Sequence, residues 1–435
     1  MKPINIGLIG WGTVGSGVVK ILLEDQDFIQ KKLEGPLILK KIADLDLEAP
    51  RPVKVDPSIL TTEADDILKN PEIDIVVELI GGIEPAKSLI LQAIRARKHI
   101  VTANKALLAI HGQEIFEAAE QNGVEVLFEA SVGGCIPIIR TLKEDLPANH
   151  INHFFGILNG TANYILTKMS REGMDFDKAL KEAQAKGFAE ADPTFDVEGI
   201  DTAHKLAILV ALAYGHNIEF DKIYMEGISH LTPLDIQFAD EFGYVVKLLA
   251  ISSVNESQIE ARVHPTLLPS DHVLAGVNGP FNAIFFNGHA VGDILLYGQG
   301  SGMMPTASAV ASDIIELARA ISKGAVRRVP SLAWRKIGED GMTLRPMDDT
   351  VTTYYFRFSV LDHPGVLSKI SGILGAHKIS ISAVMQKGRE VGGAVPIVML
   401  THEAKEVNVK NALTEIDQLD VACDKTVLIR VEDRL

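Results

Sequence analysis

The sequence predicts an α/β protein with a parallel sheet in its N-terminal part, an α+β middle part with an open sheet, and a small C-terminal domain. Two observations predict this class. Short apolar runs alternate with helical segments over about the first 130 residues, as a parallel sheet requires. The chain from 352 to 435 alternates strand and helix in the ferredoxin-like order βαββαβ.

Composition and charge exclude several classes of protein. Apolar residues make up 47% of the chain and charged residues 23%, which is typical of globular proteins. The net charge of −15 argues against nucleic acid or an anionic membrane as the main partner. Two cysteines, Cys135 and Cys423, do not suggest a disulfide framework. No apolar run is long enough for a signal peptide or a membrane span, so we expect a cytoplasmic protein.

A glycine-rich turn joins the first strand to the first helix. The run Ile4 to Ile9 predicts a buried strand, and Gly10, Gly12 and Gly15 then give G-x-G-x-x-G at the start of a helix. Gly10 permits a tight turn, Gly12 lets a pyrophosphate approach the backbone, and Gly15 lets helix and strand pack closely. The context predicts a Rossmann-type sheet that binds NAD or NADP. The alternative is a glycine-rich turn with no ligand.

The second strand, at 37–46, ends in acidic residues. Asp44 is the candidate to bind the ribose hydroxyls, although it lies farther from the last glycine than the usual fingerprint has it. A carboxylate there favours NAD. Because Lys40, Lys41 and Arg51 are near enough in sequence to bind a 2′-phosphate, the choice between NAD and NADP stays open.

Three further strands and two helices complete the predicted parallel sheet. The strands are expected at 73–80, 99–103 and 124–130, and the helices at about 84–97 and 111–121.

Ligands bind where the strands of such a sheet end. Lys105 directly follows one strand and brings an amine to this edge, unless it is simply solvated. Glu129 is expected to end another strand, just before Gly133 and Gly134. One carboxylate and several backbone carbonyls could hold a monovalent cation such as Na⁺. A hinge between domains is the alternative for this glycine-rich run.

The middle of the chain begins with a strand at 154–158, a sharp turn at Asn159-Gly160 and a helix from Thr161, whose N-terminus suits a carboxylate. A second glycine-rich loop, Tyr297 to Thr306, leads into a helix at about 305–323. This loop could cover a cofactor or be a plain connection. The open sheet is expected to come from four segments, at about 241–255, 258–264, 272–277 and 281–286.

The stretch from Gly187 to Lys205 is the strongest candidate for the chemistry. It starts as an acidic loop with Glu190 and Asp196 and runs into an apolar helix after Gly199. Asp201 and Lys205 are four residues apart and share one face of that helix. A lysine at the mouth of a buried helix can lose solvation, which lowers its pKa. A surface ion pair, a solvated turn or a divalent-metal site are the alternatives.

The C-terminal part follows a polar segment at 335–349. Strands are expected at 352–361, 380–386, 394–401 and 426–431, with helices at 366–377 and about 407–419.

Over essentially its whole length the chain resembles homoserine dehydrogenase with a C-terminal ACT domain. The most specific match is the family signature, which the chain shows at Ala183, Gly187, Asp192-Pro193, Asp196, Gly199, Asp201 and Lys205. Asn159 to Ile165 resembles the family's GTxNxI segment, and Thr102 to Lys105 its TxNK segment. Asp362 to Leu367 resembles the ACT entry DxPGVL.

The resemblance implies NAD(P)-linked interconversion of L-homoserine and L-aspartate 4-semialdehyde, a step toward threonine and methionine. It implies that Lys205 donates the proton and that Lys105 lies beside the nicotinamide. The other residues it implies fall into three sets. The sets are Glu190, Asp201, Thr161 and Asp196 for the substrate; Gly10, Gly12, Thr13, Val14, Gly15, Asp44, Lys105, Gly187 and Gly302 for the cofactor; and Glu129 with the carbonyls of Val132, Gly134 and Ile136 for sodium.

We therefore expect a dinucleotide-binding domain at 1–130 that is completed by helices within 305–330, a substrate-binding and dimerisation domain at 131–340, a linker at 341–351, and an ACT regulatory domain at 352–435. A homodimer or homotetramer is expected, with an amino-acid effector, threonine first. Two alternatives remain. One is a dehydrogenase of another small amino acid, and the other is an amino-acid sensor on an inactive scaffold; the lysine-bearing signature and the presence of both lysines argue against them.

Overall fold

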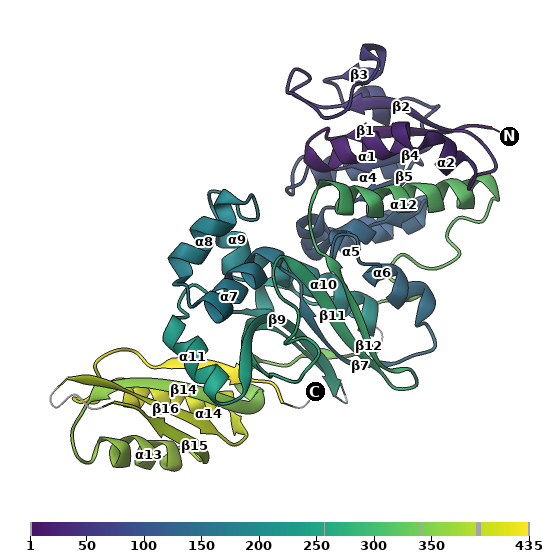
Figure 1. The fold of residues 1–435 in the computed structure, drawn as a ribbon. Coiled ribbons are helices and arrows are strands. Elements are labelled where there is room, and N and C mark those ends of the chain that lie inside the picture. Colours follow the sequence, from purple (N-terminus) through teal and green to yellow (C-terminus); the bar gives the residue numbers. More distant parts are fainter. Residues whose placement is uncertain (1, 256, 339–340, 389–392, 434–435) are drawn as a thin grey trace.

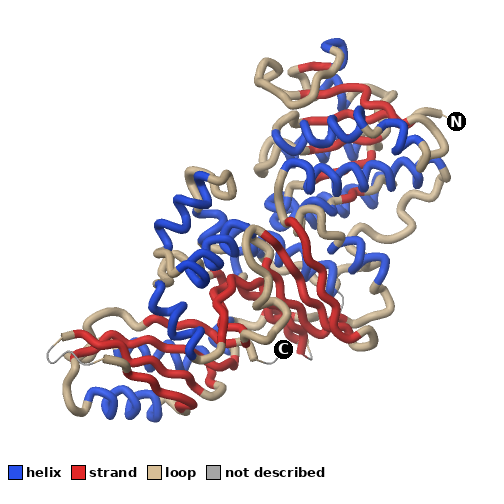
Figure 2. Tube along the Cα trace, viewed as in Figure 1, coloured by secondary structure: helices blue, strands red, loops and turns tan. Residues whose placement is uncertain are grey.

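The computed structural model describes residues 2–255, 257–338, 341–388 and 393–433. Figure 1 shows three regions: the parallel sheet with its helices at the top, an open sheet in the middle, and a small sheet with helices at the lower left. Figure 2 shows that helices cover the parallel sheet, whereas the middle sheet presents a broad row of strands on one side. The predicted fold class is confirmed.

The N-terminal sheet is parallel, with the strand order β3-β2-β1-β4-β5-β6. Its strands are β1 (Ile4–Ile9), β2 (Leu37–Ala43), β3 (Leu60–Thr61), β4 (Ile75–Glu78), β5 (His99–Thr102) and β6 (Val126–Leu127). The last strand is much shorter than the predicted 124–130. Phe128 leaves the extended region, with φ −152° and ψ 29°, so Glu129 lies in a 3₁₀ turn (η2, Glu129–Ser131) and does not end a strand as expected.

Helices from the N-terminal part of the chain and one helix that follows the middle sheet cover this sheet. They include α1 (Thr13–Glu24), α4 (Ala86–Arg95), α5 (Lys105–Asn122) and α12 (Met303–Ser322). Helix α5 begins six residues before the predicted start because the side chain of Asn104 accepts a hydrogen bond from Leu107 N and caps it. Helix α12 lies beside α1 (Figure 1), and the contact is so close that a Cβ on Gly17 would lie 2.8 Å from the Cβ of Ala307.

The middle sheet is antiparallel, in the order β12-β11-β7-β9-β10. Its strands are β7 (Ile151–Ile157), β9 (Tyr244–Asn255), β10 (Gln258–Pro269), β11 (Phe281–Gly288) and β12 (Gly292–Gln299). The predicted strand at 272–277 is wrong: these residues form turns, and their apolar side chains Leu274 and Val277 pack with Phe155 and Phe285. Strand β12 was not predicted, since its residues alternate between exposed and half-buried. The helices of this region are α7 (Gly160–Glu172), α8 (Phe176–Ala185), α9 (Thr194–Val197), α10 (Ile200–Tyr214) and α11 (Pro233–Glu241).

The C-terminal domain has the predicted βαββαβ order. It consists of β14 (Val351–Leu361), α13 (Val366–Ala376), β15 (Ile381–Gln386), β16 (Ala394–Thr401), α14 (Glu406–Ile416) and β18 (Val427–Val431). The strand order β18-β14-β16-β15 is that of a ferredoxin-like sheet.

The C-terminal sheet continues the middle sheet. Strand β18 pairs in parallel with β10 at Thr266–Arg430 and Leu267–Val431. The side chain of Arg430 is buried beside this junction and bonds Glu226 of the middle region at 2.7 Å and Glu406 of α14 at 2.6 Å. From the predicted linker, β13 (Thr343–Leu344) also pairs with β10. The C-terminal domain is thus joined to the rest of the chain by backbone pairing and by buried charge. No helix among the described residues has the length and apolar character needed to cross a membrane.

Candidate active site

The glycine-rich turn has the geometry that a bound pyrophosphate requires. Gly10 adopts φ +99°, and a Cβ there would lie 2.7 Å from the backbone of Leu79. A Cβ on Gly15 would collide with the carbonyl of Gly10, whereas the space above Gly12 is open. No side chain caps the N-terminus of α1. The backbone of Thr13 and the first turn of α1 can therefore receive an anion.

Asp44 lies beside this turn, in spite of its long spacing in the sequence. Its Oδ2 accepts a 2.5 Å hydrogen bond from Trp11 N, and its Oδ1 lies 3.6 Å from the Arg51 guanidinium. Of the cations near it in sequence, Lys40 pairs with Glu72 and Lys41 bonds the carbonyl of Ser58. Arg51, stacked on the Trp11 ring at 4.8 Å, is the cation that lies next to Asp44.

A buried glutamate that the sequence analysis missed organises the next strand end. Glu78 ends β4, and its carboxylate accepts hydrogen bonds from Thr102 Oγ1 at 2.7 Å, Ile80 N at 2.9 Å and Gly81 N at 3.2 Å. Burial raises the pKa of Glu78. Asn104 bridges to the carbonyl of Gly82 at 2.7 Å. These contacts fix the residues just before Lys105, and the acidic end of a buried strand is the signal that could have revealed Glu78.

Asp201 holds both candidate lysines. Its Oδ1 lies 2.5 Å from Nζ of Lys105, and its Oδ2 lies 2.6 Å from Nζ of Lys205. Lys205 also donates to the carbonyl of Leu158 at 2.6 Å. The structure therefore brings the lysine that follows β5 to the start of α10.

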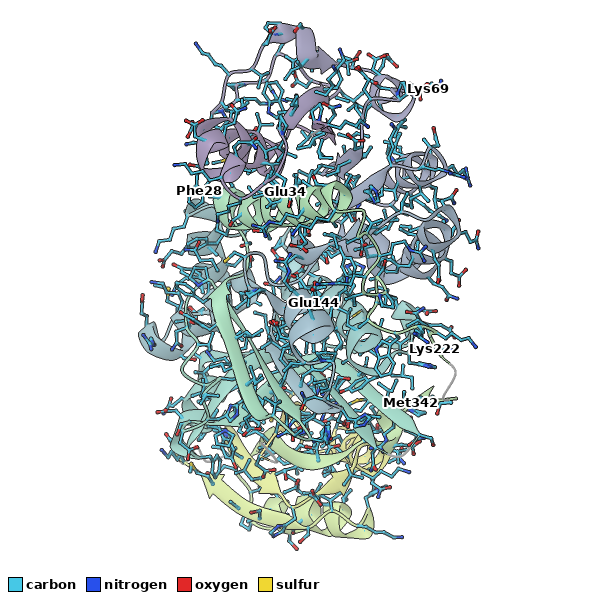
Figure 3. All side chains as sticks on the ribbon, turned by 90° about the vertical axis from the view of Figure 1, so that its right-hand side faces the viewer. Phe28, Glu34, Lys69, Glu144, Lys222 and Met342 are labelled. Atoms are coloured by element: carbon cyan, nitrogen blue, oxygen red, sulfur yellow. The ribbon has the colours of Figure 1, made fainter. Side chains whose placement is uncertain are left out.

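Lys205 differs from an ordinary surface lysine. Figure 3 shows Lys69 and Lys222 at the outer edge of the molecule, where their side chains are 77% and 59% exposed. The side chain of Lys205 is 8% exposed. Burial lowers the pKa of Lys205, against the opposing effect of Asp201. The carboxylate of Asp201 raises the pKa of Lys105, so the buried lysine is the more ready proton donor of the two.

The acidic loop surrounds this pair. Asn159 donates to Asp196 at 2.7 Å and to Asp201 at 2.9 Å, so one amide holds two carboxylates. Glu190 is exposed, and its charge contributes to the raised pKa of Lys105. Burial raises the pKa of Asp196. The sequence predicts Asn159 as part of a turn and of the GTxNxI-like segment but gives it no contact with the acids, and its amide in the Asn-Gly-Thr run is the signal for this second role.

Thr161 and Gly187 frame the loop from the other side. The Thr161 hydroxyl donates to the carbonyl of Phe188 at 2.6 Å, which ties the loop to the first turn of α7. Gly187 adopts φ +75° where the chain leaves α8. The Asn159 side chain caps α7 by accepting from Ala162 N at 2.8 Å, so the expected carboxylate site at this N-terminus already has one of its donors engaged.

The second glycine-rich loop reaches the residues of the predicted cation site. Gly302 adopts φ +118° and precedes α12. A Cβ on Gly134 would lie 2.6 Å from the carbonyl O of Gly300. Both carboxylate oxygens of Glu129 accept backbone hydrogen bonds, from Ile139 N at 2.9 Å and Arg140 N at 2.8 Å. The described residues contain no cluster of three histidine, cysteine or acidic side chains that could hold a metal ion.

The chain matches known proteins over essentially its whole length. A model of the catalytic domain of homoserine dehydrogenase matches residues 137–315, a model of the NAD-binding domain of homoserine dehydrogenase matches 10–129, and an ACT domain model matches 354–421. The homoserine dehydrogenase of Pseudomonas aeruginosa is 46% identical and that of Bacillus subtilis 40% identical, with 99% of each chain covered in both cases. The crystal structure of a homoserine dehydrogenase from Thiobacillus denitrificans superposes with a TM-score of 0.91 at 46% identity, covering 100% of this chain and 99% of the other.

Proposed function

The chain belongs to the homoserine dehydrogenase family, and from this premise we propose that Lys205 gives the proton of the reaction while Asp201 holds Lys205 and Lys105 in place. The enzyme is an oxidoreductase that interconverts L-homoserine and L-aspartate 4-semialdehyde with a nicotinamide cofactor. The observation that carries the assignment of roles is the double ion pair of Asp201. The alternative of an inactive amino-acid sensor is not favoured, because dehydrogenases match over the full length.

In the direction of aldehyde reduction, a reduced nicotinamide held at the glycine-rich turn would supply the hydride that the aldehyde carbon receives. Negative charge then grows on the aldehyde oxygen, and a nearby ammonium group stabilises it. Lys205 transfers its proton to that oxygen, and the product is the alcohol. A lysine whose pKa is lowered by burial suits this transfer, which contributes roughly 10²–10⁴ in rate. Lys105, which keeps its proton, adds positive charge beside the cofactor.

The acids of the loop suit the ammonium group of the substrate. Glu190 is exposed, and Asp196 and Asp201 meet at Asn159. We assign the substrate's ammonium to this set of three carboxylates. The substrate's carboxylate is assigned to the N-terminus of α7 at Thr161, where the positive end of the helix dipole lies.

The glycine-rich turn suits either NAD or NADP. The open space above Gly12 and the uncapped first turn of α1, with Thr13, Val14 and Gly15, fit a pyrophosphate. Asp44 is assigned to the ribose hydroxyls, and Arg51 beside it is the group that would receive a 2′-phosphate. Gly187 and Gly302 are assigned to the far side of the cofactor.

A monovalent cation is proposed at Glu129. The buried carboxyls of Glu129 and Asp313 lie close enough to influence each other, and burial raises the pKa of both, that of Asp313 to about 7. A cation would offset this crowding of negative charge. Each oxygen of Glu129 keeps a second lone pair, and the carbonyls of Val132, Gly134 and Ile136 complete the proposed donor set. Replacing sodium by a bulky organic cation at constant ionic strength should lower the Tm.

The C-terminal domain is proposed to bind an amino acid, with threonine as the first candidate, and the enzyme is proposed to work as a homodimer or homotetramer.

One assay tests the activity itself. Reduced cofactor should appear, as absorbance, when homoserine is added with NAD or with NADP. The Lys205→Ala variant serves as the control. If the wild-type protein reduces neither cofactor with homoserine but reduces one with another amino alcohol, the assignment of homoserine as the substrate is wrong.

A further inference from the structure

Asn282 connects the carbonyl that orients Lys205 to the second glycine-rich loop. It is the second residue of β11, and its side chain is 1% exposed. Its Nδ2 donates to the carbonyl O of Leu158 at 2.9 Å, the same oxygen that accepts from Lys205 at 2.6 Å. Because only the NH₂ end of an amide can donate to a carbonyl, the orientation of this amide is fixed by its partner. Two donors from different elements thus hold one carbonyl beside the reacting amine.

The other side of Asn282 packs against Gly300. A Cβ on Gly300 would lie 2.0 Å from Cγ and Nδ2 of Asn282, so only glycine leaves room for the amide. Gly300 stands two residues before Gly302, where the loop turns into α12. A shift of the loop at Gly300 would therefore displace the Asn282 amide, which bonds the carbonyl of Leu158.

The amide of Asn282 uses only part of its hydrogen-bonding capacity among the described residues. Its Oδ1 is buried and accepts no hydrogen bond from any described residue. Gly160 lies next to this oxygen, and a Cβ on Gly160 would lie 3.6 Å from Oδ1 of Asn282. A buried acceptor without a partner costs about 1–3 kcal/mol. A leucine, which has nearly the same shape, would avoid that cost.

We propose that Asn282 is a positioning residue for proton transfer, which holds the Leu158 carbonyl under Lys205 and links its place to the loop at Gly300. The proposal rests on the proposed role of Lys205. Loss of the amide NH₂ frees the carbonyl to rotate, and the ammonium of Lys205 then loses one of its two fixed acceptors. Loss of the amide is expected to lower kcat, because the amide acts on the chemical step.

Asn282→Leu is the first test. We expect kcat to fall about tenfold or more, with the KM for cofactor nearly unchanged and the Tm equal or higher. The matched control is Asn287→Ala in the same strand, where the lost hydrogen bonds join Asn152 and Asp293 far from the lysines. Its kcat should equal that of the wild type. A wild-type kcat in Asn282→Leu, next to an inactive Lys205→Ala, overturns this proposal alone; an active Lys205→Ala overturns the assigned proton donor.

Asn282→Asp keeps the test decisive if the leucine variant fails to fold. When protonated, the new carboxyl can donate its O–H to Leu158 O and replace the amide; when ionised, it repels that carbonyl. Burial raises its pKa, so the ratio of variant to wild-type kcat should fall as pH rises. The ratio is read below the pH at which wild-type kcat falls, where Lys205 is protonated in both enzymes, so that the effect of the new carboxylate on the neighbouring charges of Lys205, Asp201, Lys105 and Asp196 does not enter. A ratio that does not change with pH while the Tm is constant contradicts the proposal.

Discussion

Lys105 and Asp201 form an ion pair with 2.5 Å between Nζ and Oδ1, which joins the first turn of α5 to the first turn of α10. The second oxygen of Asp201 lies 2.6 Å from Nζ of Lys205. One carboxylate therefore serves two ammonium groups. Because the three charges are coupled, replacing any one of them changes the pKa of the other two.

Lys205→Ala should lower kcat by about two orders of magnitude or more, because it removes the group that gives its proton in the chemical step. The dissociation constant of the cofactor, measured by fluorescence titration, should stay nearly the same. A variant within about threefold of the wild type in kcat would transfer the proton-donor role to Lys105.

Asp201→Asn should move the pH dependence of aldehyde reduction. The charge of Asp201 raises the pKa of Lys205, so its removal lowers that pKa. Since the ammonium form donates the proton, kcat should begin to fall at a lower pH than in the wild type. The measurement is kcat against pH with saturating aldehyde and reduced cofactor. An unchanged alkaline limb would show that Lys205 is not the titrating group.

Asp44→Ser should weaken NAD binding more than NADP binding. The carboxylate repels a 2′-phosphate, and its loss removes the negative charge that lies 3.6 Å from the Arg51 guanidinium. The ratio of the two dissociation constants should shift toward NADP. Because Asp44 also holds Trp11 N at 2.5 Å, both affinities can fall together. Equal losses for NAD and NADP would mean that Asp44 does not face the ribose.

The sequence was sufficient to predict those features of the fold and the site that depend on local chemistry. The G-x-G-x-x-G turn, the apolar helix α10 and the pair Asp201–Lys205 each depend on residues close together in the chain. The prediction of a strand at 272–277 was wrong because Leu274 and Val277 are apolar for a different reason. Their side chains lie in turns and pack against the middle sheet. Strand β12 was not predicted because it lies at the edge of the sheet. Its residues are exposed or half-buried, so its sequence shows no regular alternation of apolar and polar residues.

The rest of the candidate site depends on long-range contacts that no motif records. The pairing of Lys105 with Asp201 needs two regions to meet, and the hydrogen bond from Asn282 to Leu158 joins β11 to the residue that follows β7. The pairing of β18 with β10 has the same character. It covers only two residue pairs, and neither strand shows an unusual pattern in sequence.

Arg430→Met should be strongly destabilising. The Arg430 side chain is 2% exposed and bonds Glu406 and Glu226, and its loss would leave the fully buried carboxylate of Glu406 without its guanidinium partner. Breaking a buried ion pair from one side costs about 3–5 kcal/mol, so urea unfolding should shift to a clearly lower midpoint. The control Lys369→Met removes an exposed pair with Asp420 and should cost less than about 1 kcal/mol. Equal shifts of the urea midpoint in the two variants would show that Arg430 does not stabilise the junction between the domains.

The proposed effector site is best tested with the domain left in place. Deleting the chain after Gly341 would remove β18 from β10 and leave Glu226, Asp235 and Arg262 without their partners Arg430, Arg357 and Glu432. Loss of activity after such a deletion would reflect this damage. Point variants in α13 avoid it.

Gly365→Ala should weaken the response to threonine and leave basal activity unchanged. Gly365 adopts φ +93° at the N-terminus of α13, and the space around it is open, so the added Cβ strains the backbone without a steric clash. The open N–H groups of that turn suit the carboxylate of an amino acid. The control is Gly372→Ala in the same helix, which has helical backbone and equally open space and should respond as the wild type does. Coupling of an effector to the active site is about 1–3 kcal/mol, or roughly 5–150-fold in affinity. If millimolar threonine neither binds to the wild type in calorimetry nor changes its activity, threonine is not the effector.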